Sequence, residues 1–289
     1  MTTTPITKLI AGLDEIATET QKSEGWCYFC IPETEYLKFE TEVKALLSGT
    51  TKLTSFHGKK FKADQANEYE QFFRIIRRYA ENSVPTILSC TLNSENWKQK
   101  FLKFCDRITT NVFTQVGVTN QDLITVCKQL TPGLFSFMRL INHFGNTNEL
   151  VMEVDSDSLK ENYPNLDTII KGNKFTADFL MTLLYNAYRK FQFANSPKLS
   201  ANGISVLKDQ YSFAIQAADV IGNFSTSYVY YKLGNTSKTR ILKGQIFEKV
   251  FGDKYGLENF SSSVRLVGQN DLELLIEGGF TMEFTAYHE

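Results

Sequence analysis

A strand-like segment that runs into a helical pattern, residues 204–224, constrains the fold more than any other part of this 289-residue chain. Residues 204–209 begin with an apolar, partly β-branched run and end in Asp209, which is typical of a buried strand followed by a tight corner. From Tyr211 onward, apolar and small residues cover most of a helix, and polar residues recur three or four positions apart on one face. We therefore predict a strand, a corner and a buried helix with one narrow polar stripe.

Two aspartates of this segment are candidates for a functional site. A carboxylate buried on a helix needs a hydrogen-bond donor, a cation or a water-filled cleft, and Asp219 lies on the polar stripe. Small residues would let the helix approach a sheet closely, so that Asp219 and Asp209 converge; they are Ala214, Ala217, Ala218 and Gly222. In the alternative interpretation, Asp209 is an N-cap or turn residue and Asp219 pairs with a lysine or an arginine.

The same segment resembles the C-terminal signature of a large, mostly bacterial family known as domain of unknown function 3800. The resemblance lies in Leu207-Lys208-Asp209 and in Ile215-Gln216-Ala217-Ala218-Asp219-Val220-Ile221. It implies a ribonuclease H-like fold and a metal-dependent nuclease activity. It also implies two landmarks upstream. One is an early strand that ends in two acids, and the other is a histidine that precedes a helix.

Both landmarks have counterparts in the chain. Residues 6–13 form an apolar run that ends in Asp14 and Glu15, although the two residues after them replace the family's serine and glycine. The segment around His57 is similar to the family's histidine segment, and an amphipathic pattern that predicts a helix follows at residues 65–78. All three landmarks occur in the family's order.

Clustered acids of this kind indicate metal-dependent phosphodiester hydrolysis. Two Mg²⁺ or Mn²⁺ ions can activate water and stabilise the leaving oxygen, and such ions are bound by oxygen ligands from separate elements. The resemblance implies that the catalytic residues are Asp14, His57 and Asp219. It implies that the metal ligands are Asp14, Asp155, Asp209 and Asp219, with Glu15 as a substitute ligand. His57 would orient water, move a proton or contact the scissile phosphate, whereas a lone histidine is otherwise more often structural.

The order of the predicted elements favours an α/β fold, a ribonuclease H-like mixed sheet flanked by helices. Strands are predicted at residues 6–13, 26–31, 51–56, 84–92, 150–155 and 204–209. Helices are predicted at residues 33–47, 65–80, 176–191, 211–224 and 238–251. Residues 93–148 are predicted to be a helical insertion that shapes one wall of the cleft, with helices near residues 97–106, 121–130 and 135–144. A C-terminal β extension, residues 235–289, has predicted strands at 264–267, 272–276 and 281–285. We predict one domain over residues 1–289.

Within this fold, the strand at residues 150–155 should lie beside the first strand. That pairing would bring Asp155 near Asp14, because strand-end carboxylates of neighbouring strands lie close together. Asp157 follows two residues later. In the alternative interpretation, residues 155–158 form a polar turn that caps the next segment.

The overall charge leaves room only for a local nucleic-acid site. The chain has 31 basic and 32 acidic residues and a formal net charge of −1, so it exerts no global attraction on nucleic acid or on an anionic membrane. The candidate contacts that follow His57 directly are Lys59, Lys60 and Lys62. Arg74, Arg77 and Arg78 follow on the next predicted helix. Charge runs are also typical of solvated faces.

Other features indicate a globular, cytoplasmic protein. Hydrophobic residues make up 42% of the chain, which is enough to fill a substantial core. The N-terminus lacks the pattern of a secretory signal, and no run of about 18 apolar residues predicts a membrane span. Cys27 and Cys30 form a C-x-x-C within an apolar strand and have no second pair, so we interpret the five cysteines as packing residues.

Two functions are consistent with these patterns. The first is a metal-dependent nuclease, for which the family implies a role in defence against mobile elements; retention of Asp14, Asp209 and Asp219 favours it. The second is a catalytically inactive ribonuclease H-like module that binds a protein partner or a second copy of itself. The altered segment after Glu15 and the near-zero net charge favour the second.

Overall fold

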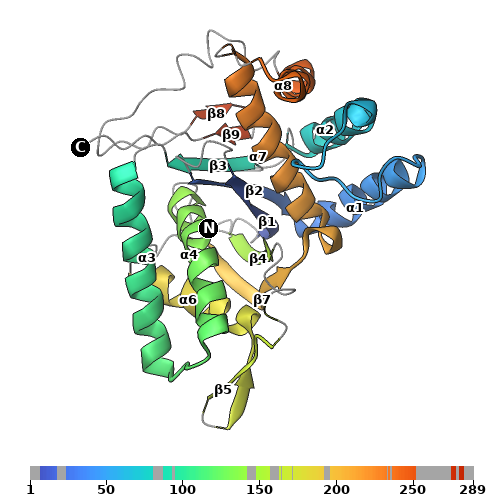
Figure 1. Cartoon of the computed structure of the whole chain (residues 1–289). Helices are drawn as coiled ribbons and strands as arrows, with labels where there is room; N and C mark the ends of the chain where they lie inside the picture. Colours follow the sequence, from blue (N-terminus) through green and yellow to red (C-terminus); the bar gives the residue numbers. More distant parts are fainter. Residues whose placement is uncertain are drawn as a thin grey trace, which may run out of the picture.

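A mixed seven-stranded sheet forms the centre of the chain, and helices cover both of its faces (Figure 1). The computed structural model describes residues 7–17, 24–80, 87–92, 95–141, 148–156, 163, 165–170, 172–191, 196–232, 234, 236–251, 275–277 and 280–282. The α/β class predicted from the sequence is confirmed at the level of a mixed sheet flanked by helices.

The sheet has the strand order β7-β4-β1-β2-β3-β9-β8. Its strands are β1 (Thr7–Ala17), β2 (Glu24–Pro32), β3 (Ile87–Leu92), β4 (Asn148–Asp155), β7 (Lys198–Leu207), β8 (Leu275–Glu277) and β9 (Phe280–Met282). β1, β2 and β3 are antiparallel to one another in sequence order, whereas β4 is parallel to both β1 and β7. β3 pairs in parallel with β9, which is antiparallel to β8. A separate hairpin consists of β5 (Thr168–Ile170) and β6 (Asn173–Phe175).

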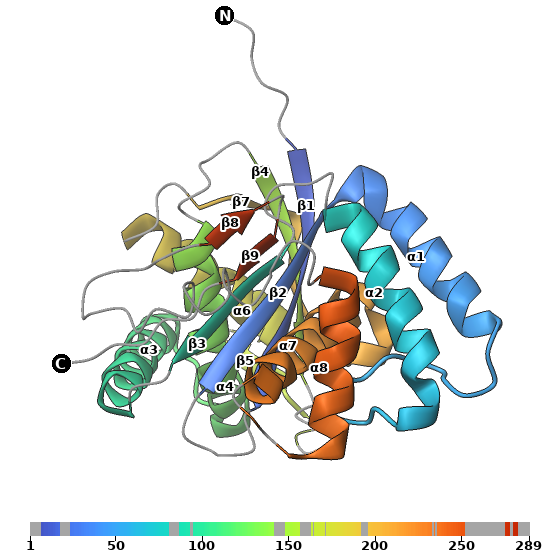
Figure 2. The ribbon, with the colours of Figure 1, turned by 90° about the horizontal axis from the view of Figure 1, so that it is seen from above.

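The helices form one layer on each face of the sheet (Figure 2). One layer contains α1 (Glu33–Ser48), α2 (Ala66–Ala80), α7 (Phe213–Lys232) and α8 (Lys238–Phe251). The other contains α3 (Glu95–Val116), α4 (Gln121–Ile141) and α6 (Ala177–Phe191). Short 3₁₀ helices lie at Ala63–Gln65 and Asp209–Tyr211. None of the helices in the described part of the chain is long and apolar enough to cross a membrane.

Each face of the sheet has its own hydrophobic core, because successive side chains of a strand point to opposite faces. Along β1, Leu9, Ala11 and Leu13 pack in the core of the α3 layer, whereas Ile10 packs in the core of the α7 layer. The same alternation separates the C-x-x-C cysteines of β2. Cys30 belongs to the α3-layer core and Cys27 to the α7-layer core, and Cys27, Cys30, Cys105 and Cys127 are buried free thiols. The prediction that these four are packing residues is confirmed.

Helix α7 lies unusually close to β1. A Cβ atom built on Gly12 of β1 would lie 2.1 Å from the carbonyl carbon of Ala214 and 2.4 Å from the nitrogen of Ile215. The first turn of α7 is capped by Ser212, whose Oγ accepts the Ile215 N–H at 3.0 Å and donates to Glu153 Oε2 at 2.5 Å. This close packing carries the residues of α7 to the ends of β1 and β4.

Most predicted elements are confirmed within a few residues. The strand at residues 150–155 is β4, which pairs with the first strand as expected. The helices predicted at residues 33–47, 65–80, 176–191 and 238–251 correspond to α1, α2, α6 and α8. The predicted strand at residues 264–267 lies outside the described residues. The strands predicted at 272–276 and 281–285 overlap β8 and β9, and the prediction of one domain stays a prediction.

Two predicted elements are wrong. Residues 51–56 form an irregular loop and not a strand, because the Phe56 N–H donates to the Gln216 side chain at 3.0 Å instead of to a neighbouring strand. The position beside β2 is taken by β3. The helices predicted at residues 121–130 and 135–144 are one helix, α4, which continues through Pro132. Residues 130–138 of α4 are buried, so that packing offsets the lost backbone hydrogen bond.

Candidate active site

A cavity of about 850 Å³ lies where β1 and β4 end, and we call it the strand-end cavity. Its lining comes from both helical layers and from the strand ends between them. Residues on the strands, in the loop before α2, and on the 3₁₀ corner and α7 are Leu13, Asp14, Glu15, Trp26, His57, Lys59, Lys60, Asp155, Ser156, Asp209 and Asp219. Residues on α3 and α4 are Leu102, Lys103, Asp106, Thr125, Lys128, Gln129, Leu130 and Pro132. The prediction that residues 93–148 shape one wall of the cleft is therefore confirmed.

The strand ends bring Asp14 and Asp155 together. β1 and β4 are parallel and pair Leu13 with Val154, so that the next residues, Asp14 and Asp155, lie side by side. Asp155 ends β4, but the predicted end of the first strand at Leu13 is wrong, because β1 continues to Ala17 by pairing with β2. The Asp14 carboxylate accepts the Glu15 N–H at 2.8 Å, and the Asp155 carboxylate accepts the Asp209 N–H at 3.1 Å. The predicted proximity of Asp14 and Asp155 is confirmed.

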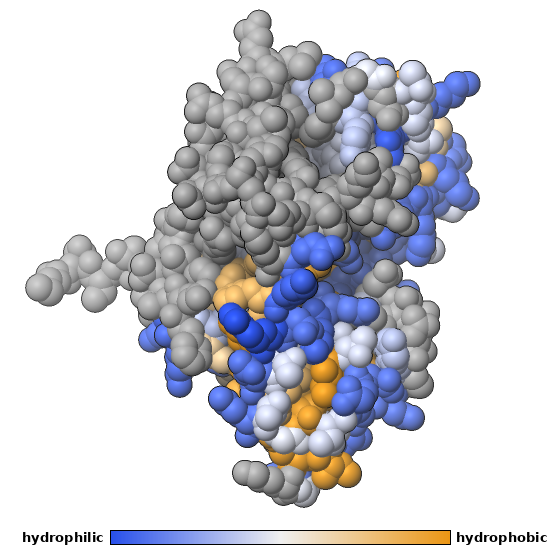
Figure 3. Space-filling view, turned by 60° about the vertical axis from the view of Figure 1, so that its left-hand side comes forward, coloured by the Kyte–Doolittle hydropathy of each residue, from blue (hydrophilic) through white to orange (hydrophobic). Residues whose placement is uncertain are grey.

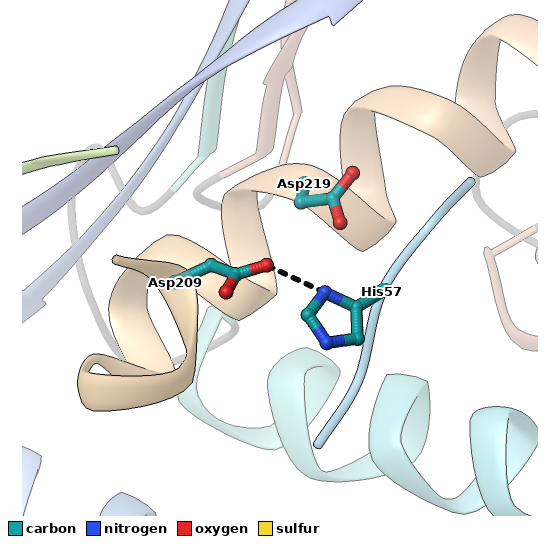
Figure 4. A group of neighbouring side chains, drawn as sticks. All are labelled: His57, Asp209 and Asp219. Carbon is teal, nitrogen blue, oxygen red and sulfur yellow. Dashed lines mark ion pairs between the residues drawn. The ribbon is translucent and has the colours of Figure 1, made fainter. Parts of the chain in front are cut away.

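His57 is held from several sides (Figure 4). Its Nδ1 lies 2.5 Å from Asp209 Oδ2, and its Nε2 lies 2.8 Å from Ser55 Oγ. The Tyr69 hydroxyl accepts the His57 N–H at 3.1 Å and donates to the His57 carbonyl at 2.8 Å. Burial raises the pKa of Asp209, but the hydrogen bond and the charge of His57 outweigh burial, so that the pKa of Asp209 lies below its ordinary value.

Asp219 is the carboxylate that connects the loop before α2 with the strand ends. Its Oδ2 accepts the Gly58 N–H at 2.7 Å, and its carboxyl also makes a hydrogen bond with that of Asp14. Gly58 has no room for a side chain, because a Cβ atom there would lie 2.4 Å from the Asn223 Cβ. The predicted polar stripe of α7 thus faces this loop through Asp219 and Asn223.

Gln216 completes the attachment of the loop. Its amide oxygen accepts the Phe56 N–H at 3.0 Å, and its amide nitrogen donates to the Asp209 carbonyl at 3.1 Å. Gln216 is almost fully buried. It therefore ties together the two segments that carry His57 and Asp209.

Burial raises the pKa values of the two central acids. The pKa of Asp14 lies well above its ordinary value because of burial, the charge of Asp219 and the charge of Asp155. Burial also raises the pKa of Asp219, against the stabilising Gly58 N–H. Two buried carboxyls beside each other are costly to ionise together. A divalent cation beside them would offset that cost.

The donor set fits such an ion. His57, Asp209 and Asp219 each offer a ligand atom, and these three atoms lie within 4.8 Å of one another (Figure 4). Asp219 is also in contact with Asp14, so it belongs both to this group and to the pair at the strand ends. Carboxylate oxygens suit Mg²⁺ and Mn²⁺, whereas an imidazole nitrogen suits softer ions such as Zn²⁺.

The remaining predicted residues differ in their positions. Glu15 is exposed and lines the strand-end cavity, as do Lys59 and Lys60. The charge of Lys59 acts on Asp14 and that of Lys60 on Asp209. Lys62 is exposed at the start of the 3₁₀ helix before α2 and is not part of the cavity lining. Asp157 lies outside the described residues.

The predicted arginines on α2 are engaged elsewhere. Arg74 pairs with Glu70 at 2.8 Å, Arg78 pairs with Glu42, and Arg77 donates to the Val250 carbonyl. Sequence reasoning missed the polar residues of α3 and α4 in the cavity, because their pattern is that of any solvated helix face. It also missed Ser55 and Tyr69, which carry no motif.

No protein-family model matches the chain, and a search of curated proteins finds no match. The family resemblance therefore rests on the residues around Asp14, His57 and Asp219 alone and stays a prediction.

The raised pKa of Asp14 predicts an unusual pH dependence in the absence of metal. Because the unfolded chain releases this proton first, the free energy of unfolding should fall as pH rises above about 4, the ordinary carboxyl range, until the folded carboxyl is also ionised. Asp14→Asn should show a flatter dependence than the wild type in urea denaturation with EDTA. Asp106→Asn, which removes an exposed carboxylate of the same cavity, should follow the wild type. Equal slopes for Asp14→Asn and the wild type would contradict this assignment.

Proposed function

We propose that the chain is a metal-dependent phosphodiesterase, a nuclease on a ribonuclease H-like fold. The observation that carries the proposal is the strand-end cavity, where aspartates from four separate segments meet His57 and two lysines. The antiparallel order of β1, β2 and β3, with β4 parallel beside β1, agrees with the sheet that the family resemblance implies. Both the fold name and the activity are proposals.

The acids are the residues that would hold the metal. Asp14 and Asp155 lie side by side on β1 and β4 and form one group. His57 and Asp209 form a second group, and Asp219 belongs to both. A bound Mg²⁺ or Mn²⁺ ion would polarise a phosphoryl oxygen and lower the pKa of a bound water. Because Asp219 is shared, it is the residue on which both groups depend.

His57 and Asp209 would move a proton. The 2.5 Å contact between His57 Nδ1 and Asp209 Oδ2 gives a proton a direct path between the two groups, so we assign His57 to proton transfer and the carboxylates to metal binding. The other ring nitrogen is bonded to Ser55, which is not one of the residues that line the cavity. Ser55 therefore orients the ring and is not placed to attack a substrate, although serine, histidine and aspartate form a hydrogen-bonded chain.

The direct test is cleavage of labelled single-stranded and double-stranded DNA and RNA. We expect cleavage with Mg²⁺ or Mn²⁺ and none with EDTA. The proposal would be overturned if none of the four substrates is cleaved and neither ion changes the melting temperature. That result would favour the inactive interaction module, which is tested by a search for a protein partner or a second copy.

His57→Gln should lower kcat by about 10²–10⁴-fold, the usual contribution of a positioned acid or base. The matched variant Ser55→Ala, which removes only the support of the ring, should cost less than about tenfold. The comparison requires kcat and KM for both variants on the same oligonucleotide. If Ser55→Ala is as inactive as His57→Gln, the hydroxyl takes part in the chemistry and its assignment as a positioning residue is wrong.

A further inference from the structure

The strand-end cavity continues well beyond the acids. Its far wall is built by α3 and α4, where Leu102, Lys103 and Lys128 are among the lining residues. None of these side chains is needed to bind a metal ion. The wall must therefore serve another purpose if the acids are catalytic, and contact with the substrate is the obvious one.

The lysines of the cavity stand on both sides of the acids. Lys59 and Lys60 belong to the loop on the α7 side of the sheet, whereas Lys103 and Lys128 belong to the opposite layer (Figure 2). Lys128 pairs with Asp106 at 2.7 Å. Lys103 is exposed, and within the described part of the chain its ammonium makes no ion pair or hydrogen bond. A chain of phosphates that crosses the acids would meet a lysine on either side.

Apolar side chains also line this cavity. Leu102 is half-buried, whereas Leu130, Pro132 and Trp26 are buried, and apolar residues lie among strongly hydrophilic ones on the α3 side of the molecule (Figure 3). Apolar surface of this kind contacts the faces of nucleobases, which are exposed in a single strand and stacked inside a duplex. A volume of about 850 Å³ is within the usual range for small-ligand pockets, about 300–1,000 Å³, and is too small to enclose a duplex.

Resting on the proposed function, we propose that the strand-end cavity binds single-stranded nucleic acid. The phosphate on one side of the scissile bond lies against Lys59 and Lys60, and a phosphate on the other side lies against Lys103. A base between them packs on Leu102, which is half-buried in the cavity wall. Gln129 and Thr125, both exposed in the cavity wall, offer hydrogen-bonding groups to the edge of that base.

The test measures binding without turnover. We measure the fluorescence anisotropy of short labelled single-stranded DNA and RNA, and of the matching blunt duplexes, in Ca²⁺ over a range of salt concentrations. Gels check that the probes stay intact. The test variant is Lys103→Glu. The matched control is Lys198→Glu, which makes the same charge change on an exposed residue at the start of β7. Lys198 lies opposite Glu149 in the register of β7 and β4, at the end of the sheet that is remote from the cavity.

We expect single strands to bind more tightly than duplexes by about tenfold or more. Lys103→Glu should weaken single-strand binding about fivefold or more and reduce the slope of log Kd against log salt by about 1, the value expected for one lost phosphate contact. Lys198→Glu should behave as the wild type. In cleavage assays, Lys103→Glu should raise KM and leave kcat unchanged.

Equal binding by Lys103→Glu and Lys198→Glu, or equal affinity for duplex and single strand, would overturn the inference. Failure of the proposed function has a different signature. If single strands bind through Lys103 but are never cleaved with Mg²⁺ or Mn²⁺, the cavity is a single-strand site without phosphodiesterase activity. If cleavage is observed and the two lysine variants do not differ, the proposed phosphodiesterase activity is kept and the proposed single-strand binding through Lys103 is rejected.

Discussion

Asp219→Asn is expected to lose both metal-dependent cleavage and metal-dependent stabilisation, and yet to be at least as stable as the wild type in EDTA. Asp219 contacts Asp14 on one side and lies within 4.8 Å of the ligand atoms of His57 and Asp209 on the other. Without metal, burial raises its pKa against the lowering by the Gly58 N–H, Asp14 and His57, so that its charge is unfavourable. An asparagine removes that charge, and its side-chain oxygen can still accept the Gly58 N–H, which donates to Asp219 at 2.7 Å.

The size of the metal effect follows from mass action. An ion at a concentration 100 times its Kd stabilises the folded state by about 2.7 kcal/mol. For a chain of this size, roughly 2–4 °C of melting temperature corresponds to 1 kcal/mol, so the wild type should melt about 5–10 °C higher in Mg²⁺ or Mn²⁺ than in EDTA. Thermal unfolding of the wild type, Asp219→Asn and Asp106→Asn measures this directly.

Asp106→Asn is the matched control, because Asp106 lines the same cavity but pairs with Lys128 on the far wall. It should respond to metal as the wild type does. An Asp219→Asn protein whose melting temperature rises with metal as much as that of the wild type would show that Asp219 is not a ligand. The carboxylate pair with Asp14 would then be a structural feature.

The strand-end acids were predictable because the rules that place them are local. Asp14 and Asp155 each follow a short apolar run, and the parallel pairing of their strands places the two residues side by side, even though β1 continues past Asp14 to Ala17. The narrow polar stripe of α7 was equally readable, since a buried helix with polar residues three or four positions apart must direct them to one place.

The loop before α2 shows where such reasoning fails. Residues 51–56 are predicted to form a strand, yet the backbone of Phe56 bonds to Gln216, which is 160 positions further along the chain. A side-chain partner that distant leaves no periodic signal in either segment. For the same reason, nothing in the sequence separates Lys103, which lines the cavity, from Arg74, which pairs with Glu70.

Gly12→Ala is expected to destabilise the fold by more than about 4 kcal/mol, a loss that single substitutions rarely cause. The new Cβ would lie 2.1 Å from the carbonyl carbon of Ala214, and backbone on both sides leaves no flexible side chain to move. Either β1 or α7 must therefore shift. Urea denaturation with circular dichroism measures the loss.

The matched control is Gly49→Ala at the C-terminus of α1. Gly49 has φ −81°, and a Cβ atom there would come no closer than 3.5 Å to the Ala45 and Leu46 carbonyl oxygens, so alanine should be neutral or stabilising by about 0.4–1 kcal/mol. Because α7 carries Asp219 and follows Asp209, any Gly12→Ala protein that still folds should also lose the metal-dependent rise in melting temperature. A Gly12→Ala protein as stable as Gly49→Ala would mean that α7 does not lie against β1 at this distance, and the convergence of Asp14 with Asp219 would lose its structural basis.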